Sequence, residues 1–273
     1  MKQSDRTNHE PADAAPGVRK ERKSGTAGAQ TLERGLDMLE LIVARPTRMP
    51  ALIRQYGLSK TTTWRLVQAL ADRRFVTVST SGEVHAGPKL LQLGARTQEQ
   101  TDLLLIARRH LDDLAAETGH SAFLGRRDGD YSVHLHRSSA NERVAVTTAP
   151  GTRRRLPETS LGKALLLDDS PAALETAARA AGLANIPQWI ADMQRSTAER
   201  TVLNQGPPPD CIHAIAAPIR DVSGRIVAAI SIASPSAYLG EERMRILAPS
   251  VRDAATTISR ALGWMPPEEA ADG

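Results

Sequence analysis

The chain has 273 residues and a formal net charge of +4 at pH 7, and 41% of its side chains are hydrophobic, which suffices for two domains with separate cores. Its single cysteine, Cys211, excludes an intramolecular disulfide framework and a cysteine-built zinc site. Aromatic residues make up only 3%, too few for the stacking platforms of single-strand binders, so duplex DNA is the nucleic acid we expect.

No apolar run approaches the roughly 18 residues of a membrane span, and the N-terminus lacks the apolar core of a signal peptide. We therefore expect a cytoplasmic protein without membrane contact. Positive charge is concentrated early in the chain: residues 1–100 hold 16 Lys and Arg against 10 Asp and Glu, and the remainder hold 19 against 21. This asymmetry favours a nucleic-acid-binding module at the N-terminal end.

Residues 1–28 are polar and show no apolar period, which predicts a disordered tail. Apolar residues then recur at three- and four-residue steps over residues 30–44 and predict a helix. Its expected buried face consists of Leu32, Leu36, Leu39 and Val43. Pro50, whose fixed φ suits a first helical position, predicts a short second helix that ends at Tyr56.

A third helix is predicted over residues 59–70, after a turn that Gly57 permits. Ser59 is placed to cap its free N–H groups. Its inward stripe consists of Thr63, Leu66, Val67 and Leu70. The opposite face carries cations, hydroxyls and an amide at spacings that a major groove accepts, so this helix is the expected DNA-reading element.

The candidate DNA-binding residues lie on or next to that outward face. They are Ser59, Lys60, Thr61, Thr62, Trp64, Arg65 and Gln68. Lys60 and Thr61 are expected to contact phosphates and set the register. The longer side chains of Arg65, Gln68 and Trp64 are expected to reach base edges.

A hairpin is predicted next, with strands at residues 75–78 and 83–86 and a turn at residues 79–82. Its tip carries hydroxyls but no Lys or Arg, so its contacts with phosphate are expected to be modest. Together, residues 29–88 are interpreted as a winged helix-turn-helix domain. Residues 89–100 then form a linker helix whose leucines need a partner, and a second copy of the chain is the one we expect.

Residues 101–265 are interpreted as a second domain of mixed α+β class, followed by a tail at residues 266–273. A helical stripe runs to Gly119, and strands are predicted at residues 121–126, 131–137 and 143–148, with Asp128-Gly129 as a hairpin turn. Helices are predicted over residues 159–167, 171–181 and 186–200. Central strands at residues 213–219 and 225–233 precede a last helix that ends at Gly263, with Pro249 marking a kink or restart.

Other chemistry finds little support in the sequence. Cys211 and His213 are two residues apart on an expected strand, but no third group orients them as a catalytic pair. His134 and His136 alternate without carboxylate or cysteine ligands, which predicts an exposed strand face and no metal site. Residues 153–155, three consecutive arginines, are interpreted as a solvated run, with steering of an anionic effector as the alternative. No cofactor is expected.

The order of these segments resembles the IclR (isocitrate lyase regulator) family of bacterial transcription regulators over roughly residues 30–263. The resemblance is carried by four stretches: Leu58-Ser59-Lys60-Thr61-Thr62 with Arg65-Leu66 and Leu70, Leu90-Leu91-Gln92-Leu93-Gly94, Thr159-Ser160-Leu161-Gly162-Lys163-Ala164-Leu165-Leu166, and Ile215-Ala216-Ala217-Pro218-Ile219. It implies a C-terminal domain like a GAF-type sensor that binds a small metabolite, and assembly as dimers or dimers of dimers.

The resemblance also implies effector contacts at Ser160, Leu161, Gly162, Ala214, Ser231 and Ala233. The chain departs from the family at several ligand positions, including Asn204, Cys211 and Ala214. Fewer polar partners favour an effector larger or more apolar than a small keto acid, or loss of sensing. We expect a regulator that reads a pseudo-palindromic operator in double-stranded DNA. The alternative is an enzyme acting on a small metabolite, with a regulatory N-terminal module.

Overall fold

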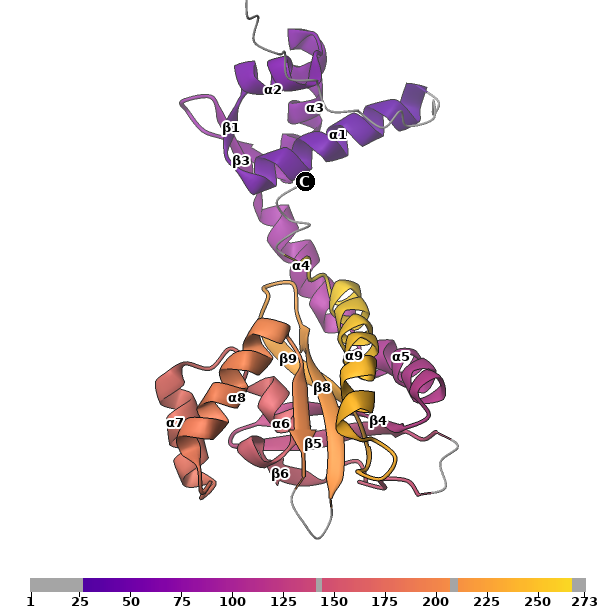
Figure 1. The fold of residues 1–273 in the computed structure, drawn as a ribbon. Helices are drawn as coiled ribbons and strands as arrows, with labels where there is room; N and C mark the ends of the chain where they lie inside the picture. The colour runs from indigo at the N-terminus through magenta and orange to yellow at the C-terminus, as the bar shows by residue number, and fades with distance from the viewer. Residues whose placement is uncertain (1–26, 141–143, 207–210, 267–273) are drawn as a thin grey trace, which may run out of the picture. The chain divides into compact units, whose positions relative to one another are not determined.

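The computed structural model describes residues 27–140, 144–206 and 211–266, and the chain divides into two compact units, residues 1–100 and 101–273 (Figure 1). Most of the two predicted tails, residues 1–28 and 266–273, lies outside the described residues. The predicted fold class is confirmed, because a helix-turn-helix unit with a small sheet precedes a unit of mixed helices and strands.

The first unit contains four helices and three short strands among its described residues. They are α1 (Ala27–Ala44), β1 (Thr47–Arg48), α2 (Met49–Tyr56), α3 (Lys60–Asp72), β2 (Val76–Val78), β3 (Glu83–Ala86) and α4 (Pro88–Gln100). Gly57 ends α2 with a φ of 60°, a left-handed conformation that glycine adopts at little cost. The chain then turns directly into α3, so the predicted helix-turn-helix is confirmed.

Helix α1 forms where the sequence predicts it, but its predicted buried face is wrong. Met38 and Ile42 are the buried residues, whereas Leu32 and Leu36 are 64% and 49% exposed. Val43 is exposed as well, and Leu39 only partly packs against the core. Two apolar stripes coexist on α1, and periodicity alone cannot choose between them. Packing against α3 and β3 decides in favour of the Met38 stripe.

The predicted hairpin is confirmed as the antiparallel pair β2 and β3, with Val78 opposite Val84. The sequence gives no sign of β1, which is two residues long and adds to the other edge of β3. Buried side chains from α1, α2, α3 and both hairpin strands form the core of this unit. They are Met38, Ile42, Leu52, Val67, Val76 and Val84.

The second unit is built on one antiparallel sheet of six strands in the order β6-β5-β4-β9-β8-β7. Its helices are α5 (Leu103–Thr118), the 3-10 turn η1 (Leu156–Glu158), α6 (Ser160–Leu165), α7 (Pro171–Ala180), α8 (Ile186–Glu199) and α9 (Glu241–Ala261). Its strands are β4 (Ser121–Asp128), β5 (Tyr131–Ser138), β6 (Arg153–Arg155), β7 (Val202–Gln205), β8 (Ile212–Arg220) and β9 (Ile226–Pro235).

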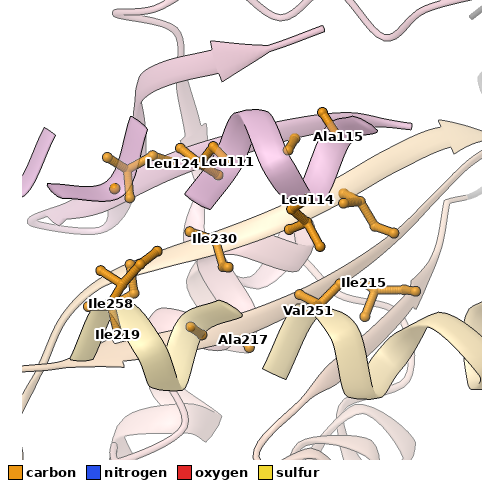
Figure 2. Packing of buried hydrophobic residues seen from close by; sticks show 14 of the residues in the cluster. Leu111, Leu114, Ala115, Leu124, Ile215, Ala217, Ile219, Ile230, Val251 and Ile258 are labelled. Atoms are coloured by element: carbon orange, nitrogen blue, oxygen red, sulfur yellow. The ribbon is translucent and has the colours of Figure 1, made fainter. Parts of the chain in front are cut away.

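One face of this sheet packs against α5 and α9 (Figure 2). Alternation along β8 sends Ile215, Ala217 and Ile219 into that core, where Leu111 of α5 and Val251 of α9 meet them. The opposite face packs against α6, α7 and α8 and has small residues at its centre. Alanines at 214, 216, 229 and 233 let α6 lie close to β8 and β9.

Three expectations for this unit need correction. The third strand is β6, which pairs with β5, whereas residues 144–149 form no strand and residue 143 lies outside the described part of the chain. The edge strand β7 was not predicted, because four residues at a sheet edge carry little alternation. Of the two roles expected of Pro249, a restart of the last helix is wrong, since α9 runs through it, and a kink stays a prediction.

Candidate functional site

The N-terminus of α3 is organised by Ser59, as predicted. The Ser59 hydroxyl accepts a hydrogen bond from the Thr62 N–H at 3.1 Å and lies 2.9 Å from the Thr62 hydroxyl. The Thr63 hydroxyl donates to the Ser59 carbonyl at 3.1 Å. The hydroxyls of Ser59 and Thr62 are thus engaged with the helix itself. The N–H groups of Lys60 and Thr61 stay at an open helix N-terminus, which attracts phosphate.

The outward face of α3 brings the predicted DNA-binding residues together. Lys60, Thr61, Trp64, Arg65 and Gln68 are all exposed, and Trp64 keeps 50% of its surface accessible. Sequence reasoning missed Asp72, which accepts a hydrogen bond from the Gln68 amide at 2.8 Å. That contact holds the Gln68 side chain along the helix and leaves its amide oxygen as the group free to read a base.

The hairpin tip contributes neutral groups only. The hydroxyls of Ser79 and Ser81 lie 2.8 Å apart, and that of Ser79 also accepts the Glu83 N–H at 3.1 Å. Both serine hydroxyls therefore serve the turn, and α3 carries the cationic surface of this part of the unit.

A cavity of about 340 Å³ lies in the second unit, between α6, the loop before β6 and the strands β4, β5, β8 and β9. We call it the effector cavity, after the effector contacts that the family resemblance led us to expect there. Its lining residues are Phe123, His134, Val146, Thr148, Arg154, Glu158, Thr159, Ser160, Leu161, Asn204, Gly206, Ile212, Ala214, Ser231 and Ala233. Five of the six residues that the family resemblance indicated are among them, at positions 160, 161, 214, 231 and 233.

The effector cavity also carries polar groups that sequence reasoning did not assign to it. Successive side chains of a strand point to opposite faces, so Arg154 lines the cavity while Arg153 and Arg155 on either side of it do not. Arg153 pairs with Asp128 at 3.0 Å, and Arg155 donates to the Ala180 carbonyl. All three arginines are exposed, as expected of a solvated run, and Arg154 in addition lines the cavity. Glu158 adds a carboxylate to the same cavity.

The expectation for His134 is wrong, since this side chain is buried rather than part of an exposed strand face. Its ring stands edge-on to Phe123 with centroids 5.7 Å apart, and Nδ1 lies 3.4 Å from the Thr152 carbonyl. Burial lowers the pKa of His134 below its ordinary value; the hydrogen bond with the Thr152 carbonyl opposes this shift, and the charge of Arg154 adds a smaller lowering. The ring is therefore neutral at pH 7 and serves as a hydrogen-bonding wall.

Two family comparisons account for most of the chain. The family described as "IclR helix-turn-helix domain" matches residues 31–79, and the one described as "Bacterial transcriptional regulator IclR C-terminal" matches residues 95–260. The chain belongs to the IclR family of bacterial transcriptional regulators. It is a DNA-binding regulator with a C-terminal effector domain, and nothing in the comparisons supports the enzyme alternative.

Relatives of this IclR-family chain match it over nearly their whole length. The HTH-type transcriptional regulator BhcR of Paracoccus denitrificans is 26% identical, over 90% of this chain and 91% of its own. The HTH-type transcriptional repressor AllR of Salmonella typhi is 28% identical, over 88% and 92%. The crystal structure of the Agobacterium tumefaciens repressor BlcR shares the fold with a TM-score of 0.71 at 22% identity, covering 86% of this chain and 97% of BlcR.

Gly162 is the one residue of the predicted effector set that does not line the cavity. A Cβ atom there would lie 2.1 Å from the Leu156 carbonyl oxygen, so only glycine lets α6 pack against η1. Its N–H donates to the Thr159 hydroxyl at 3.0 Å, which caps α6. In this IclR-family regulator Gly162 therefore positions the helix that presents Ser160 and Leu161.

A neighbouring cavity of about 560 Å³ shares Asn204 with the effector cavity. The Lys163 ammonium projects to it from α6 and donates to the Asn204 side-chain oxygen at 2.6 Å. Burial lowers the pKa of Lys163, against the opposing influence of Asp192.

The Cys211–His213 pair does not share a strand face. Cys211 precedes β8 and has a φ of 42°, and Nδ1 of His213 lies 2.8 Å from the Leu239 carbonyl oxygen. Among the described residues, no group of three or more His, Cys, Asp or Glu side chains is arranged to hold a metal ion. The helices in the described part of the chain are not long and apolar enough to cross a membrane.

Proposed function

We propose that this regulator binds a pseudo-palindromic operator in double-stranded DNA as a homodimer, with α3 in the major groove of each half-site. The observation that carries the proposal is the α3 surface, where Lys60, Thr61 and Arg65 are exposed beside an open helix N-terminus. Phosphate contacts from Lys60 and the first N–H groups would set the register. Arg65, Gln68 and Trp64 would then meet base edges. Such a target lies in the cytoplasm.

Exposed apolar side chains in the first unit support the homodimer. Leu91 of the linker helix is 78% exposed and Leu93 is 41% exposed. The unpacked stripe of α1 adds Leu32 and Leu36 to the apolar surface of the same unit. Burying these side chains against a second copy removes them from water. We take residues 29–88 as the DNA-binding domain, 89–100 as the linker helix and 101–265 as the effector domain, with a dimer of dimers as the larger assembly.

The effector cavity supports a ligand larger or more apolar than a small keto acid. Its volume of about 340 Å³ lies within the range of pockets for drug-sized ligands. Phe123, Val146 and Ile212 offer apolar contact, while Arg154 supplies a cation for one polar end. We therefore propose an amphiphilic metabolite. Such a metabolite changes DNA binding only if it has different affinities for two arrangements of the paired DNA-binding domains in the dimer.

Footprinting on DNA from the regulator's own genomic neighbourhood tests this function. We expect one protected site with two half-sites about one helical turn apart, because a two-fold dimer presents two copies of α3. Protection of a single, asymmetric half-site contradicts the dimer, and uniform weak protection contradicts specific reading. Tight calorimetric binding of a small keto acid such as pyruvate that Ser231→Ala in the effector cavity weakens contradicts the amphiphilic effector.

A further inference from the structure

A third cavity, also of about 340 Å³, lies where β4 begins and β9 ends. Its lining residues are Thr118, Gly119, His120, Val144, Ser234, Tyr238 and Arg243. None of them lines the effector cavity. Ser234 directly follows Ala233 of the effector cavity, and successive side chains of a strand point to opposite faces. The two cavities therefore lie on opposite faces of the sheet.

Two buried side chains at this cavity lack hydrogen-bond partners. Nδ1 of His120 and the hydroxyl of Ser234 have none within the described residues, and the two residues are only 7% and 1% exposed. The β4–β9 register pairs Ser121 with Ala233, and extending it by one residue brings His120 beside Ser234. Buried polar groups are almost always satisfied, so two such groups side by side indicate a missing partner.

Arg243 gives the cavity a positive charge, and among the described residues no acidic side chain pairs with it. Arg245 pairs with both Glu241 and Glu242, the acidic residues in the first turn of α9. Over the part of the chain that the structure describes, the Arg243 side chain forms no hydrogen bond or ion pair, and no acidic residue lines the cavity. Burial, and then the charge of Arg243, lower the pKa of His120. A neutral imidazole keeps one ring N–H to donate.

We propose that this cavity, which we call the anion cavity, binds the carboxylate or phosphate group of a small metabolite. The Arg243 guanidinium supplies the charge, and the Ser234 hydroxyl and the His120 ring N–H supply neutral donors. An oxyanion accepts hydrogen bonds from all three at once. Arg243 is exposed, so solvent satisfies its charge when no ligand is bound, and its place beside the two buried donors favours an anion over a water molecule. Val144 and Tyr238 form a wall for the apolar part of the ligand.

The test uses the full-length protein titrated calorimetrically with sodium benzoate and, separately, with inorganic phosphate, at constant ionic strength held with sodium chloride. Variants are Ser234→Ala and Arg243→Gln, with Ser231→Ala in the effector cavity as the matched control. Ser234→Ala removes an unpaired buried hydroxyl, so its thermal midpoint stays at or above that of the wild type. This keeps the binding measurement free of unfolding.

We expect saturable binding of benzoate, phosphate or both, weakened about tenfold or more by Ser234→Ala and by Arg243→Gln and unchanged by Ser231→Ala. Binding of benzoate alone assigns the cavity to carboxylates, and binding of phosphate alone assigns it to phosphates. Absence of saturable binding by either anion overturns the proposal. Binding that Ser231→Ala weakens and Arg243→Gln leaves unchanged overturns it too, because the anion then occupies the effector cavity. No step depends on DNA binding, so the proposed function is tested separately.

Discussion

The Lys163 ammonium donates to the side-chain oxygen of Asn204 at 2.6 Å, and Asn204 lines both the effector cavity and the larger cavity beside it. A buried ammonium that has lost its hydrogen-bond acceptor is costly. This contact therefore ties α6, which presents the effector-cavity residues Ser160 and Leu161, to the edge strand β7.

Replacing Asn204 with alanine removes that acceptor. We expect Asn204→Ala to lower the free energy of unfolding by about 1–3 kcal/mol, the range for a buried donor left unsatisfied. Asn204→Asp keeps an acceptor of the same shape and should cost less. Urea unfolding of the full-length protein measures both. Equal stability of Asn204→Ala and the wild type would show that the Lys163 contact contributes nothing.

Gly162 and Gly94 offer a matched pair of helical glycines. A Cβ at Gly162 would collide with the Leu156 backbone. Apart from the chain neighbours of Gly94 and the backbone of its own helix, no described atom lies within 4 Å of a Cβ at that position. We expect Gly162→Ala to destabilise the second unit by about 1–3 kcal/mol or more through overpacking. Gly94→Ala should stabilise α4 by about 0.5–1 kcal/mol. Thermal unfolding distinguishes them, and similar shifts for both substitutions contradict the packing role of Gly162.

The cap of α3 is open to a direct test. Ser59→Ala removes the acceptor for the Thr62 N–H and should lower the stability of the first unit by about 1 kcal/mol. Ser59→Asp keeps an acceptor and should retain most of that stability. Thr61→Ala, an exposed position next to the cap, is the control. Hydrogen exchange of the α3 amides reports the local effect, and equal exchange in Ser59→Ala and Thr61→Ala contradicts it.

Burial of His134 predicts a loss of stability in acid. Its pKa is lower in the folded chain than in the unfolded one, so the unfolded state binds more protons as the pH falls below about 6.5. Stability is therefore complete above the unfolded value and declines as the pH falls toward the folded one. We expect His134→Gln to reduce this decline, with the remainder due to groups such as His120. Urea midpoints across a pH series measure it, with His110→Gln as control. Parallel curves for wild type and His134→Gln refute the assignment.

The sequence predicts local elements better than it predicts which surfaces meet. Ser59, Gly57 and the hydroxyl-rich turn of the hairpin act through neighbours in the chain, so their roles are visible in the sequence. The buried face of α1 depends on contacts with α3 and β3, and Leu32 and Met38 belong to stripes of equal periodicity.

The effector cavity shows the same division. Ser160 and Ala214 are indicated by family motifs, and the structure places both at one cavity. Arg154 and His134 reach the same cavity from β6 and β5, and no local pattern connects them. The sequence predicts a strand at residues 143–148, whereas the structure forms β6 ten residues later. Because the three arginines are not predicted to lie on a strand, the sequence does not indicate that Arg154 faces away from the other two.

The most direct test of the central claim is DNA binding by the wild type and Arg65→Ala at several salt concentrations. Arg109→Ala, on an exposed site of α5, is the control. We predict selective binding to one neighbouring fragment, a loss of about 1–3 kcal/mol in Arg65→Ala, and no change in Arg109→Ala. Affinity should fall with salt for all three proteins. Binding that is unselective and equal in Arg65→Ala and the wild type would contradict the account, because α3 would then not read DNA.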